Sequence, residues 1–173
     1  MIRRAAILFA LLLMACHHRF VAAEGAPSFP LSSAAFQSGT TIATRFTCDG
    51  PDVSPPMSWS GAPKTDRLIV VVNDTSASGG LFVHWIADLP AGSVRLAEGR
   101  LPPGSVQGTN SFGHRRYEGP CPPHGDPAHQ YTFTVYAVRY PPVPGPTVAP
   151  ADAFKQIVLR SVGRGRITGT FGR

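Results

Sequence analysis

Glycine and proline are the residues that most constrain the fold of this chain, because 18 of each are spread over its 173 residues. Proline lacks a backbone N–H and glycine destabilises helix interiors, so breakers at this density disfavour a fold built from long helices. Short strands joined by irregular loops tolerate them. Hydrophobic residues make up 43% of the chain and charged residues 15%. This balance predicts one globular, mainly β domain.

The positive charge of the chain is concentrated in part at its N-terminus. The formal net charge is +6, and Arg3, Arg4 and Arg19 fall within the first 23 residues, which contain no acid. Beyond them, 13 basic and 10 acidic residues remain, a net charge of +3. No basic run with interleaved aromatic residues is present, so nucleic acid is not an expected partner.

Residues 1–23 have the pattern of a secretion signal. Two arginines precede the apolar run Ala5–Ala15, which is too short to span a bilayer as a helix. Two endings compete. Val21-Ala22-Ala23 suits signal peptidase, whereas Leu13-Met14-Ala15-Cys16 resembles a lipobox and would make Cys16 a lipidated N-terminus. Either ending predicts an exported domain at residues 24–173, in the periplasm or outside the cell, free or anchored to the membrane as a lipoprotein.

The remaining cysteines, Cys48 and Cys121, form an even pair. In an oxidising compartment such a pair predicts a disulfide, and two buried free thiols are the alternative.

Hydrophobic patterning predicts several strands and one helix. The helix covers residues 151–162, with Asp152 in its first turn and Gly163 and Gly165 at its end. Its apolar side chains are Phe154, Ile157, Val158 and Leu159. The predicted strands are residues 40–48, 67–73, 81–89, 130–140 and 166–171, and the fourth places Tyr131, Phe133, Val135 and Ala137 on one face. Residues 90–117 show no clear periodicity. Several short strands with few helices indicate a sandwich-like fold.

Polar residues inside apolar or rigid surroundings mark the candidate site. Asp74 ends one predicted strand and His84 lies within the next, so the aspartate is placed to orient that histidine. Taken singly, His84 is more typical of a structural histidine, and Asp74 is more typical of a turn residue. His129 follows the proline-rich loop 119–126, whose fixed φ angles can hold backbone N–H groups in one geometry. Two histidines with backbone donors suit a phosphate or carboxylate oxyanion.

Three ordered segments carry a resemblance to a known family. They are FTCDGPDVSPPMSWSGAP, VVVNDTSASGGLFVHWIADLP and GTNSFGHRRYEGPCPPHGDPAHQYTFTVYAV, and GRITGTFGR is similar to a closing strand. Together they resemble the signatures of the phosphatidylethanolamine-binding protein family, and most closely its bacterial and archaeal Raf-kinase-inhibitor-like branch. The resemblance covers Phe29 to Arg173.

The resemblance implies two antiparallel sheets in a Greek-key, sandwich-like arrangement with a few peripheral helices. It also implies a small pocket at one end that binds phosphoryl and similar anions, including the head group of phosphatidylethanolamine, with no cofactor and no metal. Carried over by motif, the ligand-binding residues are Asp74, His84, Gly119, Cys121, Pro122, His129 and Tyr131, and the residues that support the pocket are Asp49, Ser54 and Pro55.

Two departures from the family pattern bear on the ligand. The family's DPDAP segment is replaced by Asp74-Thr75-Ser76-Ala77-Ser78, without its prolines and its second aspartate. The family's HRY is replaced by His129-Gln130-Tyr131, without the arginine. These changes predict a less rigid loop and a less negative pocket.

The function expected from these features is binding of a small anion, in a module that regulates a partner protein, rather than catalysis. No G-x-S-x-G elbow is present. One alternative is a hydrolase that uses Cys121 or Ser54 with His84 or His129 as base. Another is a protease or kinase inhibitor acting through a surface loop, for which residues 90–117 are the longest candidate.

A zinc site formed by Cys48, Cys121, His84 and His129 is a further alternative, although these residues lack a local zinc-ligand spacing. If both histidines face a bound anion, binding strengthens as the pH falls through about 6.5. His114 and His124 are expected to be exposed loop residues without this role.

Overall fold

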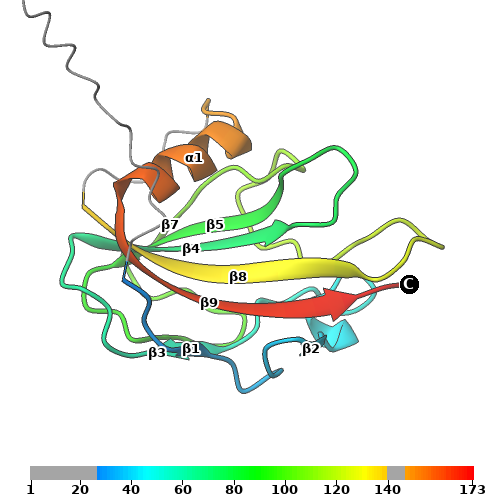
Figure 1. The fold of residues 1–173 in the computed structure, drawn as a ribbon, viewed down its shortest axis with the longest axis horizontal. Coiled ribbons are helices and arrows are strands. Elements are labelled where there is room, and N and C mark those ends of the chain that lie inside the picture. Colours follow the sequence, from blue (N-terminus) through cyan, green and yellow to red (C-terminus); the bar gives the residue numbers. More distant parts are fainter. Residues whose placement is uncertain (1–26, 140–146) are drawn as a thin grey trace, which may run out of the picture.

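A six-stranded sheet in the order β2-β9-β8-β4-β5-β7 forms the centre of the fold in the computed structural model, which describes residues 27–139 and 147–173 (Figure 1). A smaller sheet has the order β1-β3-β6. The strands are β1 (Leu31–Ser32), β2 (Thr40–Thr41), β3 (Met57–Trp59), β4 (Arg67–Asp74), β5 (Phe82–Pro90), β6 (Arg95–Leu96), β7 (Val106–Gln107), β8 (His129–Val138) and β9 (Ser161–Phe171). The helical elements are a 3-10 turn, η1 (Thr44–Phe46), and the helix α1 (Pro150–Arg160).

Both faces of the large sheet are covered. The smaller sheet packs over one face, around a core that contains Val70, Trp85 and Phe133. Helix α1 covers the other face, where Ile157 joins a second cluster that contains Val71. The expected mainly β, two-sheet architecture is confirmed. One detail was wrong, because β2 pairs with β9 in parallel and the sheet is therefore mixed.

The apolar runs of the sequence correspond to the strands at the centre of the large sheet. The continuous run of β4 is buried from Leu68 to Asp74, as expected for a strand that is covered on both faces. On β8, the predicted face that contains Tyr131 and Phe133 lies in the main core. The alternate residues Thr134 and Tyr136 are buried as well, because that face lies on the helix side of the sheet.

The predicted strand at residues 40–48 was wrong beyond its first two residues. Extended structure ends at Thr41, and the chain then turns through η1. The backbone N–H and the hydroxyl of Thr47 both donate to the carbonyl oxygen of Thr44, at 3.0 and 2.9 Å. These local hydrogen bonds satisfy the backbone without a neighbouring strand, so the β-branched residues here stabilise a turn.

Gly163 and Gly165 do not end the helix, which was a second error. Helix α1 ends at Arg160. Both glycines lie inside β9, at buried positions of that strand. A Cβ on Gly165 would lie 2.9 Å from the carbonyl oxygen of Phe29 and 2.8 Å from its ring. Glycine here allows the close approach of an N-terminal segment to the strand. Leu159, one of the four apolar side chains named for the predicted helix, is 62% exposed.

Replacement of Gly165 by alanine is therefore expected to destabilise the domain. The new methyl group would displace the Phe29 backbone, and overpacking of this kind costs about 1–3 kcal/mol. Gly79→Ala is the matched control, because a Cβ at Gly79 meets nothing within 4 Å. Urea denaturation compares the free energies of unfolding. Equal stability of the two variants would show that the approach of Phe29 to β9 is not tightly packed.

Candidate functional site

A cavity of about 280 Å³ opens where the ends of three central strands meet. Strand β4 ends at Asp74, which lies opposite Phe82 of β5 on one side and Tyr131 of β8 on the other. The loop from Ala77 to Leu81 and the loop from Cys121 to Asp126 contribute its walls. The topology therefore brings polar residues from three segments of the sequence to one end of the sheet.

His129 lies between two carboxylates in this cavity. Its Nδ1 is 2.7 Å from Oδ2 of Asp74, and because a carboxylate only accepts, Nδ1 is the donor. The other oxygen of Asp74 accepts the backbone N–H of Ser76 at 2.7 Å. On the opposite side of the ring, Nε2 lies 3.6 Å from Asp126. Asp74 thus orients His129, and not His84 as the sequence had suggested, because β8 lies directly beside β4.

His84 is oriented by a backbone group instead. Its Nδ1 lies 2.9 Å from the carbonyl oxygen of Glu118, so Nδ1 carries a proton and Nε2 is left for a ligand. Burial lowers the pKa of His84 below its usual value of 6.5, although the Glu118 carbonyl and the charge of Asp74 oppose this shift. At neutral pH the ring is therefore uncharged, and Nε2 accepts rather than donates a hydrogen bond. Phe82 and Phe112 contact the ring from the cavity side.

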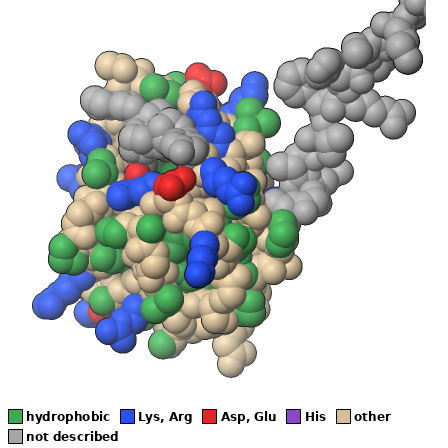
Figure 2. Space-filling model, turned by 90° about the vertical axis from the view of Figure 1, so that its left-hand side faces the viewer, with side chains coloured by type: hydrophobic (Ala, Val, Ile, Leu, Met, Phe, Trp, Pro, Cys, Tyr) green, Lys and Arg blue, Asp and Glu red, His purple; other side chains and the backbone are tan. Residues whose placement is uncertain are grey.

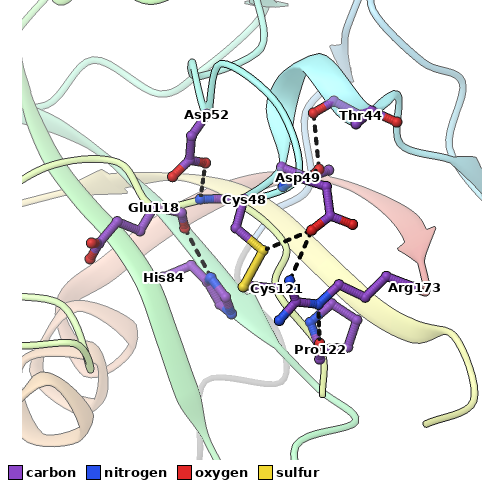
Figure 3. The surroundings of a disulfide bond; sticks show 11 residues. Thr44, Cys48, Asp49, Asp52, His84, Glu118, Cys121, Pro122 and Arg173 are labelled. Atoms are coloured by element: carbon purple, nitrogen blue, oxygen red, sulfur yellow. Dashed lines mark hydrogen bonds and ion pairs between the residues drawn. A yellow bond between two sulfur atoms is a disulfide. The ribbon is translucent and has the colours of Figure 1, made fainter. Parts of the chain in front are cut away.

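The loop at residues 118–123 is held at several points (Figure 3). A disulfide joins Cys48 to Cys121, which is the pairing that the sequence predicted. The backbone N–H of Gly119 donates to Oδ1 of Asp52 at 2.7 Å. A Cβ on Gly119 would lie 2.1 Å from the carbonyl oxygen of Phe46, so only glycine fits at this point. Burial, with a smaller contribution from the charge of Glu118, raises the pKa of Asp52.

Arg173 adds a further fixed point to the same loop. Its guanidinium donates to the carbonyl oxygen of Pro122 at 2.7 Å and to Oδ1 of Asp49 at 2.8 Å (Figure 3). Asp49 therefore supports the cavity wall through an arginine and does not face the cavity. The cavity wall is therefore held by the disulfide at Cys121 and by the hydrogen bond from Arg173 at Pro122.

The expected ligand-binding residues fall into two groups. Those that line the cavity are Asp74, His84, Cys121, Pro122 and His129. Tyr131 lies beneath them, fully buried with its ring 5.3 Å from that of His84, and burial raises its pKa. Gly119 anchors the loop from behind. The structure therefore separates contact residues from supporting residues, a distinction that the motif alone did not make.

Two residues expected to support the cavity lie elsewhere. Ser54 lines a separate hollow beside Trp85 and Tyr117, and Pro55 is buried. His114 and His124 are exposed, as expected.

Sequence reasoning missed the group of residues behind His84. Nδ2 of Asn110 donates to a carboxylate oxygen of Glu118 at 2.6 Å and to the carbonyl oxygen of His84 at 3.3 Å. His114 and Arg116 contact the other carboxylate oxygen, each at 2.8 Å. Partial burial tends to raise the pKa of Glu118, but these hydrogen bonds outweigh it and lower the pKa below its usual value. The available signal was the segment GTNSFG, which contains Asn110 and opens the third family-like segment of the sequence.

The zinc alternative requires both thiolates, and the disulfide uses both. In residues 27–139 and 147–173, no group of three or more His, Cys, Asp or Glu side chains is placed to hold a metal ion. The same residues contain no helix that is both long enough and apolar enough to cross a bilayer.

Comparison with known proteins identifies the family. Residues 32–172 match the profile described as phosphatidylethanolamine-binding protein. The chain belongs to this family. A protein of Mycobacterium tuberculosis provisionally named lipoprotein LppC is 37% identical over 150 residues, which are 86% of this chain and 75% of the relative. A UPF0098 protein of Methanothermobacter thermautotrophicus is 35% identical over 150 residues, covering 83% of this chain and 98% of that protein.

Solved structures of the phosphatidylethanolamine-binding protein family have the same fold. Escherichia coli YbcL, described as a member of the mammalian family, gives a TM-score of 0.77 at 29% identity, over 84% of this chain and 98% of that chain. Carboxypeptidase Y inhibitor, solved in complex with its proteinase, gives a TM-score of 0.51 at 17% identity, over 83% of each chain. At that identity the second comparison shows the fold alone.

Loss of the Asp74 carboxylate is expected to destabilise this family member. Asp74→Ala would leave both the buried Nδ1 of His129 and the N–H of Ser76 without an acceptor, a loss of about 2–3 kcal/mol. Asp126→Ala is the control, since that side chain is 48% exposed and 3.6 Å from the ring, and its loss costs less than about 0.5 kcal/mol. Chemical denaturation at pH 7 measures both. Equal losses would contradict a structural role for the Asp74–His129 pair.

Proposed function

We propose that the exported domain is a binding module, not an enzyme, and that its cavity takes a small zwitterionic phosphoryl compound of the phosphoethanolamine type. The observation that carries this proposal is the composition of the cavity. Asp74, Asp126, His84 and His129 line it, whereas no Lys or Arg is among its described lining residues. A simple anion would meet two carboxylates there without a fixed cation to offset them.

A zwitterion matches this arrangement better than an anion alone. Nε2 of His129 and Nε2 of His84 are the ring nitrogens not used by Asp74 and Glu118. Each can donate a hydrogen bond to a phosphoryl oxygen once it carries a proton, so binding of a phosphoryl group at His84 is coupled to proton uptake by the ring. The carboxylate of Asp126 is half-exposed beside His129 and is placed to attract an ammonium group. Phe82 and Phe112 provide an apolar side for a short methylene linker.

Two features argue against the hydrolase alternative. Cys121 shares its sulfur with Cys48, so it offers no thiolate nucleophile. Ser54 lines a different hollow from His84 and His129, so neither histidine is placed to act as its base. Both candidate nucleophiles are therefore unsuited to the role, which supports binding without chemistry.

A regulatory contact with a partner protein is the second candidate, as a protease or kinase inhibitor. The observation that favours it is a pair of exposed apolar side chains at the rim of the cavity, Leu81 at 40% and Phe112 at 41% exposure. A partner that covered this rim would sense whether the cavity is occupied. The signal pattern of residues 1–23 and the lipoprotein name of a relative support the proposal that the domain is exported.

Titration calorimetry of the exported protein with phosphoethanolamine, inorganic phosphate and acetate tests the proposal. Phosphoethanolamine is expected to bind more tightly than phosphate, by up to about fivefold, since an ammonium–carboxylate contact is worth up to about 1 kcal/mol. Asp126→Asn removes that preference, whereas His124→Gln, an exposed loop variant, preserves it. Equal affinity for phosphate and phosphoethanolamine in the wild type would contradict the zwitterion proposal.

The pH dependence of binding tests His84 separately. Because the pKa of free His84 lies below 6.5 and a bound phosphoryl group favours the charged ring, affinity should keep rising as the pH falls below 6.5. The gain levels off only below the lowered pKa. The ratio of wild-type to His84→Gln affinity, measured from pH 7.5 to 5.0, removes the titration of the ligand itself. A ratio that does not change with pH would exclude direct contact.

A further inference from the structure

The end of the domain opposite the cavity carries a group of cations. The cavity lies where β4 ends and β8 begins, whereas the opposite end lies where β4 begins and β8 ends. The ten residues of β8 separate the two ends by about 30 Å, at a rise of roughly 3.3 Å per residue. Figure 2 faces this opposite end, where Lys and Arg side chains are spread over the surface.

Strand pairing places these cations together. Val138 pairs with Ser161, so Arg139 and Arg160 flank the same step of the sheet. Lys64 lines a small hollow with Arg139, next to a single acid, Asp66. The group, called the basic end below, also includes Arg164, which pairs with Tyr136 near the end of β8 and lies on the side of the sheet covered by α1.

Most cations of the basic end are not neutralised within the domain. Arg67, which also lies here, is paired with the buried carboxylate of Asp88 at 2.6 Å and is not counted in the group. For Lys64, Arg139, Arg160 and Arg164, the described residues provide no carboxylate within 4 Å that forms an ion pair. Their charge is therefore available to an external anionic surface.

Two exposed apolar side chains lie among these cations. Leu159, directly before Arg160, is 62% exposed, and Val94, which lines a hollow with Lys64, is 61% exposed. Exposed aliphatic groups beside cations are typical of surfaces that enter the boundary between head groups and acyl chains.

The chain also enters the domain at this end. Ser28 bridges to Arg164, and the N–H of Arg164 donates to the carbonyl oxygen of Pro27 at 2.9 Å. Ten residues lie between Cys16, the lipidation candidate, and Pro27, so the two are at most about 40 Å apart when the chain is extended. An anchor at Cys16 would therefore keep the basic end within reach of the membrane.

From these observations we infer that the basic end docks on an anionic phospholipid surface, so that the cavity faces away from the membrane at a distance of about 30 Å. In this orientation the cavity cannot take a head group from the bilayer on which the domain rests. It takes a soluble ligand, or one presented from the opposite side. The inference does not depend on the identity of the ligand.

Vesicle sedimentation of the full exported protein tests the docking. The probe is the ratio of binding to vesicles with 30% phosphatidylglycerol over vesicles of pure phosphatidylcholine, because an N-terminal lipid would contribute to both. Arg139→Glu with Arg160→Glu should lower this ratio about 25-fold or more, since each cation near an anionic membrane contributes roughly fivefold. Arg100→Glu with Arg115→Glu changes the net charge equally on other surfaces and should have little effect. Raised salt should weaken the wild-type preference.

Hydrogen exchange with and without the anionic vesicles tests the orientation. Protection is expected in residues 61–66 and 159–166 and not in residues 75–84 or 119–129. A wild type without preference for anionic vesicles, equal losses in the two double variants, or protection confined to the cavity loops would each overturn the inference. Leu159→Gln, an exposed substitution, should weaken docking without lowering thermal stability. Unchanged binding of this variant to the anionic vesicles would contradict docking through the basic end, because Leu159 lies directly beside Arg160.

Discussion

The hydrogen bond from Nδ1 of His84 to the carbonyl oxygen of Glu118 connects a buried central strand to the loop that forms the cavity wall. This contact fixes the tautomer of the histidine and the position of the loop together. The disulfide at Cys121 and the Asp52–Gly119 bond hold the same loop from its other side. Because the loop is fixed before a ligand arrives, little ordering cost accompanies binding. The chemistry of the cavity therefore depends on a backbone carbonyl that no sequence motif displays.

The fold was largely predictable because its central strands carry long apolar runs. Strand β4 and strand β5 read as buried strands, and the three motifs placed the cavity at their ends. The errors arose where a residue type has two physical uses. Gly165 was taken as a helix terminator, whereas it makes room for Phe29, and the threonines around Thr47 were taken as strand formers, whereas they close a turn.

The site was predictable as a set of residues but not as a set of contacts. Asp74 and both histidines were named, yet the partner of each histidine depends on which strands are neighbours. Asp74 bonds His129 because β8 pairs with β4, while His84 is reached by the segment that contains Glu118, 34 positions later in the sequence. The role of Arg173 depends on the last strand returning beside the loop at Pro122, which composition and periodicity do not show. Strand register also determines that the carboxylates of the cavity lie at one end of β8 and the cations of the basic end at the other.

Nitrogen NMR of the imidazole rings at neutral pH measures the central contact directly. The structure predicts that His84 is neutral with its proton on Nδ1, shared with the Glu118 carbonyl, and with Nε2 unprotonated and free to accept from a ligand. A proton on Nε2 with a bare Nδ1 would contradict the anchoring of the loop through His84. A doubly protonated ring at pH 7.5 would contradict the effect of burial on its pKa.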